Sequence, residues 1–432
     1  FQRAQGIIDT PKDLFEYMLS KGDGMINEEK LMKYCENSAE NLYWTIDHGA
    51  QHSRDPWNKT APRLGCTPNN KPATVVEATH SSIPTWRVHN AVNGGFMTNG
   101  DGGRITGPLT MTYLGLGGEI LFNTSLKEIL KADGKVAGVA CEKLDGSKVT
   151  IKADNVLVCT GGYAANFEKT HRMFKTLKND NYHLHNVPDG NIGEGEEAAK
   201  AVGANVVDSP GIQIVYTSMT CGVGVNEEAG LIVSETGKRH ADEWTYMYHV
   251  ATGHIKAEDA TIIYYICDKN DPHPMAQYGM TLNEVASPTG KTVEELCASI
   301  DRAIATNPMY QGRKSIDPKV LQATIDRYNE LCEKGKDDDF SKPADRMKPV
   351  KGPQMWALPL LPFPTVTFGG IDSDCDSRVL DANGKVIPGL YAAGEVSHVG
   401  LYGIEYPTCG MGVGGTIFFC REAVKDILKN NK

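Results

Sequence analysis

The periods at which apolar residues recur change along the chain, and these changes mark the elements that we expect. Apolar residues spaced three to four apart follow Thr10 and Asn27, which predicts two helices with these residues as N-caps. From Glu119 onward the short apolar runs EILFNT, VAGVACEK and KVTIKADNVLVCT are separated by Asp-Gly turns. They predict a hairpin meander that continues into a strand ending at Thr160.

Between Gln213 and Lys351 strand and helix patterns follow one another. LIVSE and ATIIYYICD predict strands, whereas VEELCASIDRAIA and PKVLQATIDRYNELCEKG predict amphipathic helices. Residues 51–104 are rich in Pro, Gly, Asn and His without a sustained period, which predicts a long loop region. A chain of 432 residues exceeds one ordinary core and therefore predicts two domains.

Glycine clusters follow two predicted strands. Gly161 and Gly162 end an apolar strand, where a doubly wound fold places a nucleotide ligand. Near the C-terminus, a strand from Val386 to Tyr391 precedes a helix from Gly410 to Lys429 whose first turn is mostly glycine. Bare amides at a helix N-terminus attract anionic or electron-rich groups. Tight turns and close packing would require the same glycines, so both interpretations stay open here.

Composition excludes several classes of function. A net charge of −10 argues against nucleic acid as the main partner, because phosphate binding needs a basic face. No run of about 18 apolar residues is present, so we expect no membrane span. The eleven cysteines form no C-x-x-C pair, so we expect no metal site and interpret them as reduced thiols of a cytoplasmic protein.

Three motifs, in this order, resemble the flavoprotein family of fumarate reductases, urocanate reductases and 3-ketosteroid dehydrogenases. They are VLVCTGG at 156–162, YNELCEKGKDDDFSKP at 328–343 and PGLYAAGEV at 388–396. The resemblance extends over almost the whole chain and implies FAD as cofactor. It also implies an α/β fold, with a Rossmann-like FAD-binding domain and an inserted α+β capping domain that closes over the substrate.

The resemblance also sets the expected domain boundaries. Residues 1–212 and 352–432 are expected to form the FAD-binding domain, and residues 213–351 the capping domain. The strand, G-x-G-x-x-G turn and helix with which this family begins do not occur near the start of the sequence. We therefore expect the FAD-binding domain to be incomplete at its N-terminus, with roughly one hundred residues upstream of Phe1.

The resemblance implies two groups of cofactor-binding residues. The turn after the strand that ends at Thr160 is used against FAD in the family, and the turn and helix start near the C-terminus are expected to contact the same cofactor. The residues concerned are Gly161, Gly162, Ala393, Gly394, Glu395, Met411, Gly412 and Val413.

The substrate-binding positions of the fumarate reductases are changed in this chain. Val215, Met247 and Pro407 match the family's substrate-binding histidine, proton-donating arginine and carboxylate-binding arginine. Without those guanidinium groups, a small dicarboxylate is a poor substrate. Tyr406 and Gly410 instead have the Y-x-x-x-G spacing of the ketosteroid dehydrogenases, in which a tyrosine hydroxyl and a glycine amide hydrogen-bond to the substrate ketone.

A further tyrosine is expected to handle the proton at the neighbouring carbon. Tyr246 is the first candidate and Tyr248 the second, because they flank Met247. A phenol with a pKa near 10 is protonated at neutral pH, as a proton donor must be. Trp244, Tyr246 and Tyr248 also alternate as on one face of a strand, so a packing role is the competing interpretation.

These residues predict an FAD-dependent oxidoreductase that moves hydride between flavin N5 and a carbon–carbon bond conjugated to a ketone, in either direction. The expected substrate is a small molecule, a steroid-like or other apolar ring ketone. Nicotinamide, ferredoxin and quinone remain open as the electron partner. One alternative is a reductase of an unsaturated carboxylic acid such as fumarate, urocanate or a cinnamate, with Arg239 or Arg104 as the clamp. Another is a non-catalytic fragment or subunit that retains half a flavin site.

Overall fold

The structure is a computed structural model that describes residues 9–50, 103–177, 184–217, 230–243, 247–257, 262–268, 287–306, 313–407 and 410–430. The chain forms two compact units, of which the first comprises Phe1–Tyr163, Asn191–Gly211 and Thr367–Lys432. The second comprises Ala164–Gly190 and Ile212–Val366. The segment Ala164–Gly190 thus groups with the second unit, whereas the sequence analysis assigned it to the FAD-binding domain.

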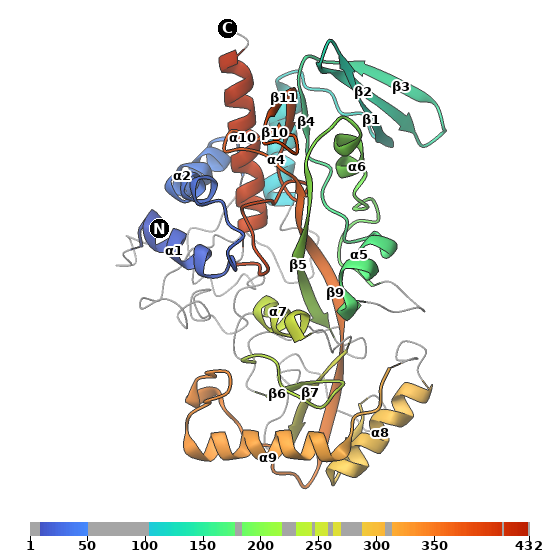
Figure 1. Cartoon of the computed structure of the whole chain (residues 1–432), viewed down its shortest axis with the longest axis vertical. Coiled ribbons are helices and arrows are strands. Elements are labelled where there is room, and N and C mark those ends of the chain that lie inside the picture. The colour runs from blue at the N-terminus through green and yellow to red at the C-terminus, as the bar shows by residue number, and fades with distance from the viewer. Residues whose placement is uncertain are drawn as a thin grey trace. The chain divides into compact units, whose positions relative to one another are not determined.

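The first unit contains helices and two small sheets (Figure 1). Its described helices are α1 (Pro11–Ser20), α2 (Glu28–Asp47), α4 (Gly103–Gly115), α6 (Glu194–Ala201) and α10 (Met411–Asn430). Its strands are β1 (Thr124–Ala132), β2 (Lys135–Lys143), β3 (Lys148–Lys152), β4 (Val156–Val158), β10 (Arg378–Leu380) and β11 (Val386–Ala392). The strands β5 (Val206–Thr217) and β9 (Met355–Ile371) each continue from one unit into the other.

Local sequence signals explain the start of both N-terminal helices. The Thr10 hydroxyl accepts from the Asp13 backbone N–H at 3.2 Å, while the Thr10 N–H donates to the Asp13 carboxylate, so the two residues form a capping box. The Asn27 side chain accepts from Lys30 N at 3.0 Å at the start of α2. Both predicted caps are confirmed.

The predicted first strand of the meander is wrong in position. Residues 119–124 were expected to form it, but β1 begins at Thr124, which pairs with Lys143 at the far end of β2. Asn123 adopts a positive φ of 54° and Phe122 is 77% exposed, so the chain turns here before a partner strand is within reach. The sheet order β1-β2-β3 is otherwise the expected antiparallel meander.

A second small sheet brings the two glycine-rich turns together. Its order is β10-β11-β4, and β11 and β4 are parallel, with Leu390 beside Val156 and Ala392 beside Val158. Buried apolar residues from these strands, from β2 and from α6 form one core beneath them. Because parallel strands end at the same edge of a sheet, the segments after β4 and β11 emerge side by side.

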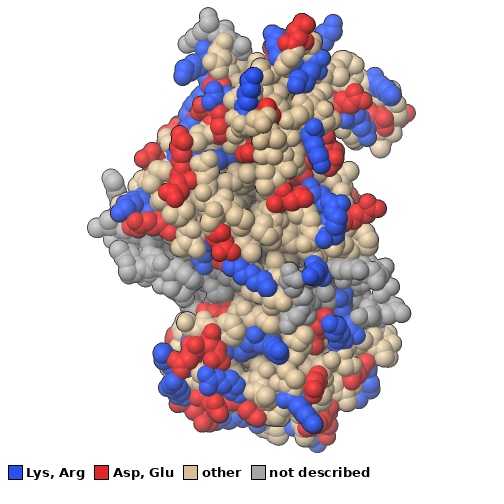
Figure 2. Space-filling model, in the orientation of Figure 1, with Lys and Arg blue, Asp and Glu red and all other residues tan. Residues whose placement is uncertain are grey.

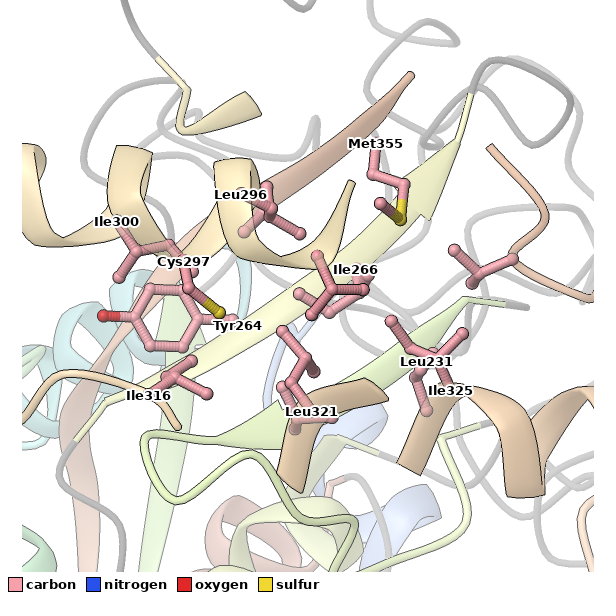
Figure 3. Packing of buried hydrophobic residues seen from close by; sticks show 14 of the residues in the cluster. Leu231, Tyr264, Ile266, Leu296, Cys297, Ile300, Ile316, Leu321, Ile325 and Met355 are labelled. Carbon is pink, nitrogen blue, oxygen red and sulfur yellow. The ribbon is translucent and has the colours of Figure 1, made fainter. Parts of the chain in front are cut away.

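The second unit is built around one hydrophobic cluster (Figure 3). Its described elements are α5 (Phe167–Met173), a 3-10 turn (Lys175–Leu177), β6 (Leu231–Ser234), α7 (Met247–Ala257), β7 (Ile263–Asp268), β8 (Thr289–Gly290), α8 (Val293–Thr306), α9 (Pro318–Lys334) and a second 3-10 turn (Ala344–Arg346). Side chains from β6, β7 and β9 pack with those of α8 and α9, including Leu231, Ile266, Leu296, Leu321 and Met355. The strands and amphipathic helices predicted for this region are confirmed.

The strand-face interpretation of Trp244, Tyr246 and Tyr248 is wrong for the last residue. Tyr248 lies in α7, which begins at Met247, so the alternation does not reflect a strand at this position. Trp244 and Tyr246 lie outside the described residues, as does most of the predicted loop region at 51–104. Its last two residues already belong to α4.

Charged side chains of both signs are intermixed on the face shown in Figure 2. No helix among the described residues is long and apolar enough to cross a membrane. Nor does any cluster of three or more His, Cys, Asp or Glu residues in the described ranges have the arrangement of a metal site.

A buried lysine fixes α2 to the C-terminal part of the first unit. Lys30 Nζ donates to Ser373 O, Ser373 Oγ and Val399 O at 3.1–3.2 Å. Burial lowers the pKa of Lys30 from 10.5 to about 8, although nearby acidic groups oppose the shift.

The lowered pKa of Lys30 predicts that the free energy of unfolding rises with pH. Between pH 8 and 10.5 the unfolded chain holds the Lys30 proton and the folded protein releases it, so the free energy of unfolding should increase by about 3 kcal/mol across this window. Urea unfolding of a Lys30→Met variant should lack this increment. Lys33→Met is the matched control, because ion pairs with Asp376 and Glu422 raise the Lys33 pKa above its usual value. Equal pH slopes for wild type and Lys30→Met would contradict the prediction.

Candidate flavin and substrate site

The turns after β4 and β11 are joined by hydrogen bonds and by close packing. Ala393 N donates to Val158 O at 3.1 Å. Gly161 and Gly394 both adopt positive φ, 78° and 80°, which side chains disfavour. A Cβ on Gly162 would lie 1.9 Å from Thr367 Oγ1 and 2.5 Å from Glu395 Oε1, so only glycine fits there.

Glu395 is the centre of a buried hydrogen-bond network at this edge. Its carboxylate accepts from Thr367 N at 2.8 Å, from Thr367 Oγ1 at 3.1 Å and from Asn191 Nδ2 at 3.3 Å. Burial raises the pKa of Glu395, while these hydrogen bonds act in the opposite direction. The carboxylate therefore holds the two turns and β9 in place. Thr367 and Asn191 are the residues that sequence reasoning missed, since neither belongs to a recognisable motif.

The start of α10 presents backbone rather than side chains. Gly410 has a φ of 77° and its carbonyl accepts the first helical hydrogen bond, from Gly414 N at 2.8 Å. Gly410 and Val413 are exposed, whereas Met411 is buried. Among the described residues, a Cβ on Gly412 would meet only the Tyr406 hydroxyl within 4 Å. This first turn thus presents glycine backbone and the partial positive charge of a helix N-terminus, which suit an electron-rich ligand.

The Tyr406 hydroxyl lies at this helix start. Its oxygen accepts from Gly412 N at 2.8 Å. The phenol is buried, with 6% of its surface exposed, and its ring lies against those of Phe368 and Tyr402. An N–H donated to the phenol oxygen polarises the O–H bond and makes it a stronger donor.

The loop that carries Tyr406 is anchored by the N-terminal helices. Tyr17 donates its hydroxyl proton to Pro407 O at 2.6 Å, and Lys21 pairs with Glu405 at 3.0 Å. Asn41 of α2 donates to Gly414 O at 3.0 Å. Several elements of the first unit thus fix the position of the phenol relative to α10.

These features fit a flavin. Positive-φ glycines at the carboxyl ends of two parallel strands allow close approach of a ligand to the backbone. The glycine-rich turn of α10 offers N–H groups to electron-rich atoms of the same ligand. Gly161, Gly162, Ala393 and Gly394 are brought to one edge of the sheet, while Glu395 turns its carboxylate into the protein.

A family model described as "FAD binding domain" matches residues 2–413. The chain belongs to this family of flavoproteins. FAD is its cofactor, and it is a flavin-dependent oxidoreductase by family.

Relatives include a "Fumarate reductase (cytochrome)" from Shewanella frigidimarina, 27% identical, where the alignment covers all of this chain and 68% of the relative. A "Urocanate reductase" from Eggerthella lenta is 24% identical, with 91% of this chain and 61% of the relative covered. The chain thus spans about two thirds of these relatives.

Solved structures show the same fold. A 3-ketosteroid-delta4-(5alpha)-dehydrogenase from Rhodococcus jostii RHA1 has a TM-score of 0.74 at 23% identity, with 98% of this chain and 84% of that chain covered. The open form of a flavocytochrome c3 fumarate reductase has a TM-score of 0.63 at 21% identity, with 98% and 68% covered. The expected family, α/β fold class and cofactor are therefore confirmed.

The structure describes only one of the two tyrosines predicted to handle the proton. Tyr246 lies outside the described residues, and Tyr248 lies in the first turn of α7. Thr408 and Cys409, between Tyr406 and Gly410, also lie outside them. Both tyrosine roles therefore stay predictions.

Arg239, one candidate for a carboxylate clamp, is bound within the second unit. Its guanidinium donates to Glu243 at 2.8 and 2.9 Å and to Asp337 at 2.9 Å. Lys342 Nζ lies 3.1 Å from the same Glu243 carboxylate, and all four side chains are at least 95% buried. A guanidinium with two buried carboxylate partners serves the fold. Releasing it to a substrate would leave Asp337 without this cation and Glu243 with Lys342 alone.

Replacement of Arg239 by methionine should therefore destabilise the fold rather than change substrate binding alone. We expect the free energy of unfolding to fall by about 3–5 kcal/mol, because the buried Asp337 carboxylate loses this cation and Glu243 is left with Lys342 alone. Arg327→Met is the control, since Arg327 pairs with Asp339 at the surface and its loss should change stability far less. Urea unfolding measures both variants. Unchanged stability, combined with lost reduction of an unsaturated acid, would assign Arg239 to the substrate instead.

Proposed function

We propose that this protein transfers hydride between flavin N5 and a carbon–carbon bond conjugated to a ketone. The observation that carries the proposal is the Tyr406 hydroxyl at the first turn of α10, 2.8 Å from Gly412 N and four residues before the exposed Gly410. A phenol and a backbone amide are neutral donors, and together they suit a carbonyl oxygen that gains negative charge.

In this proposal the protein residues bind and polarise the substrate. Bound FAD supplies or accepts the hydride. Tyr406 and the Gly410 amide donate to the keto oxygen and stabilise the enolate that forms as hydride is transferred. Tyr246, or Tyr248 in its place, gives or takes the proton at the carbon next to the ketone. The second unit contributes these tyrosines and is the capping domain of the proposal.

A reductase of an unsaturated acid is the second candidate. It is favoured by the relatives, among them the fumarate and urocanate reductases. It is disfavoured by the buried ion pairs of Arg239, which leave this guanidinium committed to Glu243 and Asp337. The described part of the first unit places an aromatic group, Tyr406, at the helix start where bidentate carboxylate binding would need a guanidinium.

Anaerobic stopped-flow mixing separates the two candidates. FAD-loaded protein is reduced with dithionite and mixed with a cyclic enone, with fumarate or with a cinnamate, while flavin absorbance reports reoxidation. We expect the enone to reoxidise the flavin at least about 100-fold faster than either acid, because one donor to a developing oxyanion is commonly worth that much and Tyr406 and the Gly410 amide suit a keto oxygen. Faster reoxidation by an acid would favour the second candidate. A protein that binds FAD but reacts with none of them would overturn the proposal.

A further inference from the structure

Two cysteine side chains from distant parts of the sequence lie close together beside the turn after β4, Thr160–Gly162, here called the flavin turn. Cys159 follows β4 and directly precedes Thr160-Gly161-Gly162, while Cys420 lies on α10. Their Sγ atoms are 3.6 Å apart. We propose that Cys159 and Cys420 are a redox-active pair, which a small disulfide such as oxidised glutathione converts reversibly into a disulfide that links α10 to the end of β4.

The elements that the bond would join already pack together. Thr416 lies one helical turn before Cys420 on α10, and a Cβ on Gly394 would lie 3.1 Å from its Cγ2 atom. The turn at Gly394 is in turn hydrogen-bonded to β4 through Ala393 N and Val158 O. A disulfide needs a sulfur separation of about 2.05 Å, so the two sulfurs must approach by about 1.5 Å. Side-chain rotation together with a small shift of either element supplies this approach.

The two thiols differ in exposure and in acidity. Cys159 is exposed and Cys420 half-buried, so the pair is open to a reagent from the Cys159 side. The hydrogen bond between the sulfurs lowers the pKa of Cys420 and raises that of Cys159. Cys420 is therefore the better source of thiolate, which is the attacking species in exchange.

The reaction balances with glutathione disulfide as the oxidant. The Cys420 thiol loses its proton to water, and the thiolate attacks one glutathione sulfur and releases one glutathione thiolate. Cys159 then loses its proton and attacks Cys420 Sγ, so that the second glutathione thiolate leaves. Both released thiolates take up protons. The protein gives up two electrons and two protons, and one glutathione disulfide becomes two glutathione molecules.

The proposed disulfide makes the link between the flavin turn and α10 depend on the thiol redox conditions, which is a property separate from the proposed catalysis. The disulfide would fix the residue next to the Thr160–Gly162 turn to the helix whose first turn faces the cofactor. It would also close a loop of about 260 residues, which restricts the unfolded chain more than the folded one. We therefore expect the oxidised form to have the higher Tm.

The test equilibrates the FAD-loaded protein in glutathione buffers of increasing oxidised fraction, blocks free thiols with iodoacetamide and maps peptides without reduction. We expect one cross-linked peptide pair that contains Cys159 and Cys420, the loss of two free thiols, a higher Tm and full reversal by reduced glutathione. Cys159→Ser and Cys420→Ser should each abolish the cross-link, whereas Cys375→Ser, which changes another half-buried cysteine, should retain it.

Two outcomes would overturn the proposal. One is recovery of both thiols alkylated, or separately joined to glutathione, across the whole range of buffers in folded wild-type protein. The other is an unchanged loss of thiols in the Cys159→Ser variant. Peptide mapping of the wild type decides the first outcome even if a serine variant fails to fold, and circular dichroism identifies such a variant.

Discussion

Replacing Tyr406 by phenylalanine should slow hydride transfer between flavin and enone by about 100- to 1000-fold, which is the usual cost of removing one donor to a developing oxyanion. The change removes the hydroxyl that lies 2.8 Å from Gly412 N and leaves the ring against Phe368 and Tyr402. Single-turnover stopped-flow measurement with reduced, FAD-loaded protein isolates this step. The loss should fall on the rate at saturating substrate, because the hydroxyl acts mainly on the charged transition state.

Two further variants make the Tyr406 result specific. Tyr391→Phe removes another phenol hydroxyl of the first unit, one that donates to Asp426 at 2.9 Å, and should leave hydride transfer unchanged. Tyr246→Phe should slow the reaction separately, since it tests the proton-handling role predicted from the sequence. If Tyr406→Phe and Tyr246→Phe both transfer hydride at the wild-type rate with FAD bound, the site assignment is wrong.

Gly162→Ala should lower the free energy of unfolding by about 2–3 kcal/mol, the typical cost of forcing an extra carbon into a packed site. The new Cβ would lie 1.9 Å from Thr367 Oγ1 and 2.5 Å from Glu395 Oε1, so the network that joins the two turns must open. Since these turns are the proposed flavin contacts, the variant should also purify with less FAD. Urea unfolding and the ratio of flavin to protein absorbance measure the two effects.

Two further variants distinguish a clash at Gly162 from the general effect of replacing a glycine by alanine. Gly190→Ala places a Cβ with no atom of the described residues within 4 Å and should change stability by less than about 0.5 kcal/mol. Combining Gly162→Ala with Thr367→Ala removes the nearest clashing atom, so the double variant should lose less stability than the sum of the two single changes. Strict additivity would mean that the contact with Thr367 is not the cause.

Local signals in the sequence were sufficient for most of the elements. Thr10 and Asn27 cap their helices through hydrogen bonds that span only three residues, so a short stretch of sequence contains all the partners. The same holds for α8 and α9, whose apolar spacing predicts their buried faces. The first strand of the meander was misplaced, because the residue at which it begins depends on its pairing with Lys143 rather than on its own composition.

The sequence by itself determined the family and the cofactor, because the glycine turns and their order are contiguous motifs that physical chemistry restricts to few residue types. Only the tertiary structure decided how those motifs are used. Glu395 binds Thr367 and Asn191, and Cys159 meets Cys420, although each pair is separated by tens to hundreds of residues. The tertiary structure likewise brings Arg239 into a hydrogen bond with Asp337, 98 positions away. Such contacts depend on which strand ends and helix faces converge, and no local pattern of residues encodes that.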